Sequence, residues 1–458
     1  MASAPSPAPL DAATKAKNVQ RLYIHMFARV FNACQNIQGE PQIVLDLCRG
    51  DVSASMRLLA TTSTAGGLLQ FLANPSIGGL SDTYGRKAFL RIGPLFNIVS
   101  NATVALFPSN FWAFCVLRTL DDALTTLSGS TTTSAAISDC AAGPELAIAM
   151  SKLGSYIGLG VLLGPVIGDS LFARFGYRAV YASKAFVSAL HFCFVSLCVS
   201  ETLPPAQRRP SSGFKSPFSF TELFSNGAAL RKLSVVAGLQ TFTDGKNVND
   251  LEQLWFVDAV KMPIAATTTY VMSYGVAIMA SGAAVVPMLL RRLGSRGFTT
   301  FVSLASLHAA SWLRLTPCLF RRQTNFTNFV AHILWGAIPR PWAMFAALLV
   351  ATPGIDAHSS NAVTAMATDV AQGLRSKKYP MGMGRGEYAG FSGNLRAITV
   401  AVGPMLYGYI YAAGRQTRMG SRVNLGYFAA AIVGCLLPEL VHRTLTEQEM
   451  QFTTKRER

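Results

Sequence analysis

Apolar stretches of about 20 residues recur along the chain, and short polar segments separate them. A stretch of this length, wound as an α-helix, crosses the hydrocarbon core of a lipid bilayer. Of the 458 residues, 50% are hydrophobic and only 14% are charged, whereas a soluble domain carries about 25% charged residues. Because so few charges cannot cover a globular surface in water, the sequence predicts an all-α protein that crosses a membrane many times.

Twelve stretches fit this description, and a Pro-, Ser- and Arg-containing linker at 201–232 divides them into two sets of six. The predicted spans are 22–44, 57–79, 92–109, 112–138, 147–171, 179–200, 233–256, 264–289, 299–318, 342–369, 387–412 and 424–442. We therefore expect two six-helix bundles, 22–200 and 233–442. Residues 1–21 are predicted as a disordered tail, and residues 443–458 as a second polar tail.

The net charge of +17 does not point to nucleic acid, because the cations form no single basic domain. They lie in short clusters between the apolar stretches, and more of them flank the side that carries the termini. The positive-inside rule then places both termini in the cytoplasm, although the loop near 415–422 opposes it. We expect a multi-pass protein of a plasma or organellar membrane that functions as a monomer. The eight cysteines have no paired spacing, so we expect neither a disulfide framework nor a metal site.

The stretch GGLSDTYGRK, which begins at Gly78 and ends at Lys87, interrupts the apolar pattern between the second and third spans. Gly78 permits a close helix contact, and Gly85 permits a tight turn. Asp82 can accept hydrogen bonds from backbone donors or lie against the positive N-terminal end of another helix. Arg86 and Lys87 hold the loop on the cytoplasmic side. The alternative interpretation is an ordinary hairpin between two spans.

A glycine motif, GLGVLLGPVIGD, lies within the predicted fifth span. Three of its four glycines, Gly160, Gly164 and Gly168, recur at i, i+4 and i+8 and therefore share one helix face, and the proline after Gly164 loosens the helix. This pattern predicts a hinge along which a partner helix slides, or, alternatively, a close-packing face without a mechanical role. A Gly-Pro pair recurs in the eleventh span, as two related halves require. The members of this helix-hinge motif are Gly160, Gly164, Pro165, Gly168, Gly403 and Pro404.

These motifs resemble those of the major facilitator superfamily. The loop from Gly78 to Lys87 is similar to its signature loop, with Thr83 in place of the usual basic residue. The glycine motif resembles the fifth-helix motif of the drug:proton antiporter branch, with Asp169 in place of a further glycine, and 384–414 resembles the eleventh span of tetracycline-type exporters. The resemblance implies twelve helices in two bundles, with the substrate bound between them at the membrane midplane.

Ionisable residues are costly inside a membrane and are therefore functional candidates. In LRTLDDALTT of the fourth span, Arg118 lies three residues before Asp121 and four before Asp122, so the three share a helix face. Arg118 matches the arginine of the family's fourth-span motif. A carboxyl group between an apolar surrounding and a guanidinium can load and release a proton. The alternative is an ion pair that only lowers the cost of insertion.

Polar residues in three other spans are candidates for lining a substrate cavity. They are Asn32, Gln35, Gln240, Asp356 and His358.

The chain has no GxxxxGK[ST] phosphate-binding motif, and nothing in it predicts an enzyme or a cofactor. The sequence predicts a secondary transporter that exports small organic solutes by proton-coupled antiport. A metabolite uniporter or symporter is the first alternative, and a receptor that binds a solute without moving it is the second. The expected partners are a small-molecule substrate, protons and the lipid bilayer.

Overall fold

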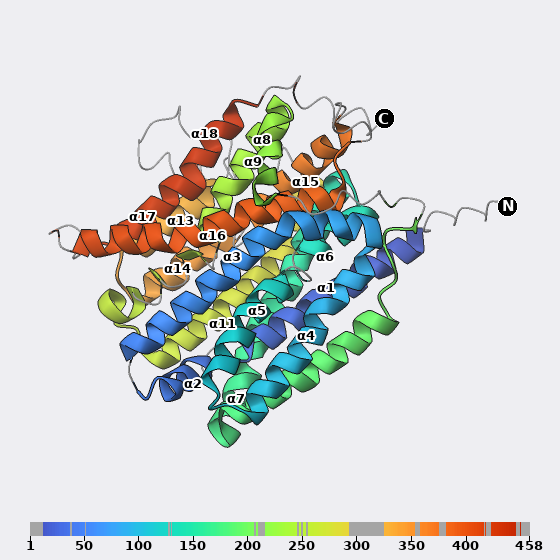
Figure 1. The fold of residues 1–458 in the computed structure, drawn as a ribbon. Coiled ribbons are helices and arrows are strands. Elements are labelled where there is room, and N and C mark those ends of the chain that lie inside the picture. The colour runs from blue at the N-terminus through green and yellow to red at the C-terminus, as the bar shows by residue number, and fades with distance from the viewer. Residues whose placement is uncertain are drawn as a thin grey trace. The chain divides into compact units, whose positions relative to one another are not determined.

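The chain is described from a computed structural model, and the account that follows concerns the residues that it describes. These are 12–36, 39–50, 52–126, 129, 131–205, 208, 216–244, 247–248, 251–252, 255–292, 325–352, 358–374, 382–415, 417, 423–445 and 449. Helices connected by turns make up this part of the chain, and no strand occurs in it (Figure 1). The prediction of an all-α protein is confirmed.

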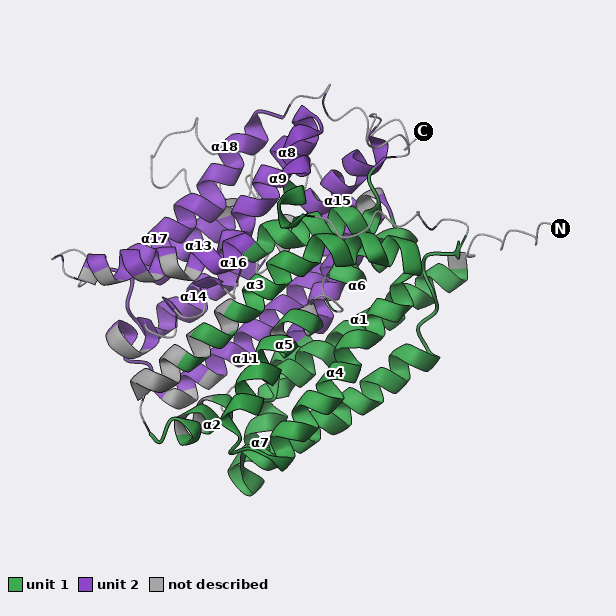
Figure 2. Ribbon diagram, in the orientation of Figure 1, with its two compact units in different colours: residues 1–141, 159–220, 383–397 green, residues 142–158, 221–382, 398–458 purple. Residues whose placement is uncertain are grey.

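The chain divides into two compact units (Figure 2). Unit 1 comprises Met1–Ala141, Leu159–Phe220 and Met383–Ala397, and unit 2 comprises Ala142–Gly158, Thr221–Gly382 and Ile398–Arg458. Each unit therefore contains a helix segment from the other half of the sequence.

Unit 1 contains helices of very different lengths. They are α1 (Ala12–Cys34), α2 (Gly39–Leu47), α3 (Val52–Tyr84), α4 (Arg86–Leu106), α5 (Phe111–Thr126), α6 (Thr132–Cys140) and most of α7 (Gly143–Leu197). Within α7, Gly176 has φ 71° and ψ −176° and so separates two helices. Glycine reaches this positive φ without the steric cost that a side chain would add. The predicted fifth and sixth spans are these two helices.

Unit 2 contains shorter helices. They are α8 (Glu222–Ser225), α9 (Ala228–Gln240), α11 (Ile264–Ala280), α13 (Asn325–Ala337), α14 (Pro341–Ala351), α15 (His358–Gly373), the C-terminal part of α16 (Arg385–Arg415), α17 (Leu425–Ala431) and α18 (Leu437–Arg443). Short π-helical segments occur at Phe256–Val260, Ser281–Val285 and Ile432–Leu436.

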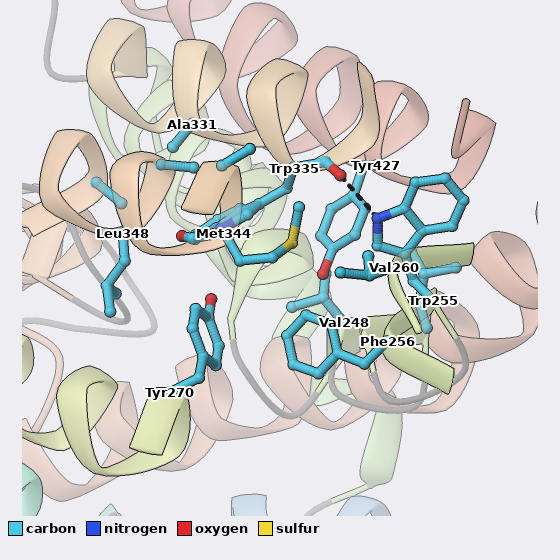
Figure 3. Close-up of a cluster of buried hydrophobic side chains, with 14 of the residues drawn as sticks. Val248, Trp255, Phe256, Val260, Tyr270, Ala331, Trp335, Met344, Leu348 and Tyr427 are labelled. Carbon is cyan, nitrogen blue, oxygen red and sulfur yellow. Dashed lines mark hydrogen bonds between the residues drawn. The ribbon is translucent and has the colours of Figure 1, made fainter. Parts of the chain in front are cut away.

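Aromatic and aliphatic side chains together form a buried hydrophobic cluster in unit 2 (Figure 3). The Trp255 indole is fully buried and donates to the Trp335 carbonyl oxygen at 2.9 Å. The Trp335 indole in turn donates to the Met344 carbonyl oxygen at 3.2 Å. Each buried N–H therefore has an acceptor, so these large side chains are buried without losing a hydrogen bond.

The boundaries of the first span differ from the prediction. Helix α1 begins at Ala12, within the segment predicted as a disordered tail, and ends at Cys34, before α2 begins at Gly39. The first turns of α1 are rich in polar residues, so this part of the helix does not stand out as an apolar stretch. The predicted tenth span corresponds to two helices, α14 and α15, and the predicted ninth span, 299–318, lies outside the described residues.

Four helical segments of the described chain are long and apolar enough to cross a bilayer. They are Arg86–Leu106, Glu145–Leu197, Thr269–Arg292 and Leu425–Arg443. The total of twelve spans therefore stays a prediction.

Candidate functional site

The turn between α3 and α4 holds a buried ion network within unit 1. The Arg86 side chain is buried, and its Nη2 lies 2.7 Å from Asp82 Oδ1 while its Nε lies 3.0 Å from Asp139 Oδ2. Its Nη1 also donates to Ser81 Oγ at 2.6 Å. Gly85, with φ 99°, makes the turn that brings Arg86 back to Asp82. One guanidinium thus binds the end of α3 to α6.

The same carboxylate binds the N-terminus of α16. The Gly386 N–H donates to Asp82 Oδ1 at 3.1 Å, and the Glu387 N–H donates to Asp82 Oδ2 at 2.9 Å. The first N–H groups of a helix have no intrahelical acceptor and carry its positive dipole end. In the structure, Asp82 lies at the N-terminal end of another helix and accepts hydrogen bonds from backbone donors there. The joint links the two halves of the sequence, because α16 belongs to the second half.

Two acidic residues that the sequence analysis does not single out complete this network. Glu201 accepts hydrogen bonds from the Arg86 N–H at 2.8 Å and the Lys87 N–H at 3.2 Å and so caps the N-terminus of α4. Thr202 Oγ1 donates to Asp139 Oδ2 at 3.2 Å. Glu201 and Asp139 each directly follow a predicted span, and this position could have marked them as candidates in the sequence.

Backbone contact between α3 and α16 depends on glycine. A Cβ on Gly78 would overlap the Gly386 carbonyl oxygen, and a Cβ on Gly390 would lie 2.6 Å from the Asn74 carbonyl oxygen. Such distances are too short for real Cβ contacts, so the two helices cross at a separation that only glycine permits.

The glycine face of α7 packs against α1 and the residue that follows it. A Cβ on Gly168 would overlap the Gln35 carbonyl oxygen, and a Cβ on Gly164 would lie 2.6 Å from Cys34 Cβ. Gly160 contacts α1 in the same way. The three glycines therefore share one packing face, as their spacing predicts, and Pro165 is buried beside it. Whether α1 slides along this face stays a prediction.

In unit 2, the second Gly-Pro pair lies in α16. A Cβ on Gly403 would lie 3.1 Å from Asn247 Cγ, so this glycine also has a close neighbour. The side chain of Pro404 lies outside the described part of the structure.

A cavity of about 140 Å³ lies within unit 1 among α1, α2, α4, α5 and the second helix of α7. Four of its lining residues are ionisable acids or bases, namely Glu40, Arg118, Asp121 and Lys184. Two of the four, Arg118 and Asp121, were predicted from the fourth span. The Asp122 side chain lies outside the described residues.

The cations of the cavity differ in their partners. Arg118 Nε forms an ion pair with Glu40, and Arg118 Nη1 donates to Thr62 Oγ1 at 2.5 Å. The Lys184 side chain is 6% exposed, and its Nζ lies 5.0 Å from the centroid of the Tyr181 ring. The sequence analysis passes over Lys184 and Glu40. Lys184 lies inside the predicted sixth span. Because an ionisable residue inside a membrane is costly, it could have been chosen as a functional candidate for the same reason as Arg118.

The predicted cavity residues of the first span lie near this cavity but have other partners. The Asn32 amide donates to Ser188 Oγ at 3.0 Å, and Ser183 Oγ donates to Gln35 Oε1 at 2.9 Å. Both amides are buried and join α1, or the residue next to it, to the second helix of α7.

The remaining predicted cavity residues belong to unit 2. Gln240 is buried at the end of α9 in unit 2. Asp356 lies outside the described residues, and His358 begins α15 but its side chain is not described.

Comparison with known proteins identifies the family. A model of the Major Facilitator Superfamily matches residues 41–404, which is most of the chain. The chain therefore belongs to the major facilitator superfamily, whose members are integral membrane transporters and not enzymes.

The relatives of this chain share only a low percentage of identical residues with it. The Hippocampus abundant transcript 1 proteins of Mus musculus and Homo sapiens are 22% identical over 358 residues, which cover 75% of this chain and only 64% of those proteins. The Hippocampus abundant transcript-like protein 1 of Bos taurus is 24% identical over 379 residues, with 81% of this chain and 68% of the relative covered. The multidrug resistance protein MdtG of Escherichia fergusonii is 30% identical over 143 residues, 31% of this chain and 34% of that protein.

Solved structures show the same fold. The human organic anion transporter MFSD10 (TETRAN) aligns with a TM-score of 0.72 at 17% identity, covering 93% of this chain and 99% of that one. The proton:xylose symporter XylE aligns with a TM-score of 0.66 at 12% identity, covering 96% and 99%. Similarity at this identity establishes the fold alone. The drug:proton antiporter branch stays a prediction.

Proposed function

We propose that the chain is a secondary transporter that moves a small organic solute across a membrane by alternating access and couples this movement to protons. The charged cavity of unit 1 is the observation that carries the proposal. Carboxylates and cations in one small cavity can exchange charge with a proton or a solute, which an inert helix bundle has no need to do. Twelve spans in two bundles, cytoplasmic termini and a monomeric state belong to the same proposal.

Asp121 is the proposed proton carrier. Its carboxyl group lines the cavity next to Arg118, one turn earlier on α5. In a surrounding of low dielectric constant, the charge of a carboxyl group depends strongly on its neighbours, so a bound solute changes its affinity for a proton. This mutual dependence couples the two movements.

The direction of coupling follows from the charge of the solute. A cationic or hydrogen-bond-donating solute competes with the proton for Asp121, which gives the antiport that the sequence motifs predict. An anionic solute that binds Lys184 is held better when Asp121 is protonated, which gives symport. The buried ammonium group of Lys184 is the specific observation that favours this second candidate.

The relatives do not decide the solute. They include an organic anion transporter, a proton:xylose symporter and a multidrug resistance protein. One fold therefore serves solutes of different chemistry, and the site must identify the solute.

Proteoliposomes that contain a pH-sensitive dye test the proposal. Solutes from a thermal-shift screen of drugs, sugars, amino acids and organic ions are added outside vesicles without a pH gradient. Antiport raises the pH of the lumen, symport lowers it, and uniport carries radiolabelled solute without a pH change. A solute that binds but never crosses the membrane identifies a receptor and rejects the transporter.

Replacement of Asp121 is expected to separate transport from its driving force. In D121N, uphill transport driven by a proton gradient should fall at least about ten-fold, because the amide cannot carry the proton. Downhill solute exchange should persist. D121E is the matched control and should keep coupling, and D122N measured in parallel assigns the role of the neighbouring residue. Intact uphill transport in a D121N/D122N double variant would remove the coupling role from this cluster.

The gate and the hinge are assigned within the same proposal. The joint of Asp82 and Arg86 with α16 is the proposed cytoplasmic gate, because it binds both halves of the sequence through a few polar contacts. The glycine face of α7 is the proposed hinge, because its close backbone contacts let helices move without side chains interlocking.

A further inference from the structure

Glu252 is an acidic side chain of unit 2 that has no cationic partner in the part of the chain that the structure describes. It lies within the predicted seventh span, four residues before Phe256. The residue is partly buried, and the Tyr270 hydroxyl is the polar group that lies against its carboxyl group. An ionised carboxyl group is costly in such a place unless a proton or a cation neutralises it. Glu252 is therefore able to bind a positive group from outside the chain.

The groups that face Glu252 are aromatic and uncharged. In the described structure, the titratable side chains around its carboxyl group are Tyr270 and Tyr274 of α11 and Tyr427 of α17. A phenol is neutral at physiological pH. The Tyr427 ring packs on the Trp335 ring, with the two centroids 5.9 Å apart. Because the faces of such rings carry negative charge density, these surroundings favour a positive group next to Glu252.

Two buried polar atoms beside this carboxyl group have no hydrogen-bond partner among the described residues. They are the Tyr427 hydroxyl and His332 Nε2. His332 Nδ1 donates to the Asn328 carbonyl oxygen at 2.7 Å, so Nε2 carries no hydrogen and is an acceptor. The His332 and Tyr427 ring centroids are 6.1 Å apart. Since most buried polar atoms have a partner, these two atoms indicate a ligand with N–H or O–H groups.

We propose that Glu252, Tyr270 and Tyr427 form a binding site for the protonated amino group of an organic amine. The ammonium group pairs with the Glu252 carboxylate, and the faces of the tyrosine rings attract its positive charge. Its N–H groups have acceptors in the carboxylate and the Tyr427 hydroxyl. The apolar part of the amine packs against the hydrophobic cluster to which both tyrosines belong (Figure 3).

A metal ion does not fit this site. Calcium and magnesium take several oxygen ligands, and zinc takes nitrogen, sulfur and oxygen ligands together. No group of three His, Cys, Asp or Glu residues that could hold a metal ion occurs among the described residues. A single carboxyl group surrounded by aromatic rings suits an organic cation instead.

The site would also exclude a proton and an amine from binding together. A protonated Glu252 is neutral and no longer attracts an ammonium group, so each ligand displaces the other. The link to transport rests on the proposed function, in which this competition gives antiport of an organic amine against protons. Binding itself depends on neither Asp121 nor transport.

Binding of phenethylamine hydrochloride to the purified full-length protein in detergent tests the inference without any gradient. Isothermal titration should show saturable binding of this amine at pH 7. The control ligand is 2-phenylethanol, which has the same carbon skeleton but a hydroxyl group in place of the ammonium group. It enters detergent micelles as well, and it should bind at least about ten-fold more weakly, because a charge-assisted hydrogen bond is absent. Equal binding of the amine and the alcohol overturns the proposal.

Variants assign the binding to Glu252. E252Q should weaken binding of the amine at least about ten-fold, whereas E252D, the matched control, keeps the charge and should bind more tightly than E252Q. Unchanged affinity in E252Q rejects the site. D121N measured in parallel shows whether the amine binds in unit 1 instead, because loss of affinity in D121N but not in E252Q also rejects the site.

A second variant covers the case in which E252Q does not fold. Y427F keeps the aromatic ring and removes only the hydroxyl group. It should weaken binding of the amine at least about two-fold, because a neutral hydrogen bond is lost. Unchanged affinity in Y427F then rejects the site.

The site and the transporter can be rejected independently. Amine binding that requires Glu252, without flux of amine or protons in proteoliposomes, keeps the site and rejects the transporter. Proton-coupled flux of a different solute, without amine binding, rejects the site and keeps the transporter.

Discussion

Replacing Arg86 by Met is expected to destabilise unit 1 by about 3–5 kcal/mol, the cost of removing one partner from a buried ion pair. The variant leaves the carboxylates of Asp82 and Asp139 buried without their shared guanidinium. Because methionine is a long, unbranched side chain, the packing should change little, and the loss of stability should come mainly from the removal of the positive charge. The measurement is the thermal unfolding midpoint of the purified protein in detergent.

Lys87 provides the matched control for this substitution. It is the neighbouring cation of the same loop, but its side chain is only partly buried. K87M should change the free energy of unfolding by less than about 1 kcal/mol, as is usual for exposed charges. A double variant, R86M/D139N, should recover part of the stability because it removes one of the two buried carboxylates that lose Arg86, the one that among the described residues keeps only Arg385 as an ion-pair partner at 3.5 Å. Equal unfolding midpoints for R86M and K87M would show that the ion network does not stabilise the fold.

The destabilisation of R86M should also depend on pH. Asp139 lies beyond the predicted fourth span, where burial raises the pKa of its carboxyl group and Arg86 and Arg385 lower it, with Asp82 adding to the rise. Without Arg86, the pKa of Asp139 in the folded state rises further above its unfolded value of about 3.9. The folded protein then binds the proton more tightly than the unfolded chain does, so stability is lost as the pH rises from about 4 through the raised pKa. R86M should therefore be closest to the unmodified protein in acid.

The local chemistry of the signature loop could be predicted from the sequence, but its partners could not. An aspartate followed by a turn glycine and an arginine predicts an acceptor and a cation at a helix end, and Asp82 and Arg86 occupy these roles. Asp139, Glu201 and Gly386 lie far away in the chain, so no local pattern connects them to the loop. Such contacts are fixed by the packing of whole helices.

For the charged cavity, too, the sequence predicts the residues that are close together in the chain but not their distant partners. The spacing of Arg118 and Asp121 predicts that they share a helix face, and both line the cavity. Lys184 and Glu40 reach that cavity from α7 and α2, and their distance from α5 is decided by tertiary packing. The length of the apolar stretches and the scarcity of charge predicted the fold class. They missed the start of α1, because polar residues in a helix end do not raise its hydropathy.

Replacing Gly78 by Ala is expected to open the joint between α3 and α16. The new Cβ would overlap the Gly386 carbonyl oxygen and lie 3.0 Å from Gly390 Cα. Both neighbours are backbone atoms and cannot rotate away as a side chain can, so the two helices must separate. Overpacking of this kind costs about 1–3 kcal/mol. The hydrogen bonds of Asp82 to the first turn of α16 should lengthen or break as a consequence.

Cysteine labelling measures this opening. Ser81 is 1% exposed and lies beside Asp82, so S81C in a background without other cysteines should react slowly with a polar maleimide. With G78A added, the rate should rise at least about ten-fold, because about 1.4 kcal/mol of destabilisation of the closed joint increases its open population ten-fold. G67A is the matched control on the same helix, since a Cβ at Gly67 would meet no described atom within 4 Å outside the local backbone of α3. Alanine there should stabilise α3 slightly and leave the labelling rate unchanged. Equal labelling in the G78A and G67A backgrounds would mean that glycine at position 78 does not control the joint, and the gate would then depend on the charges of Asp82 and Arg86 alone.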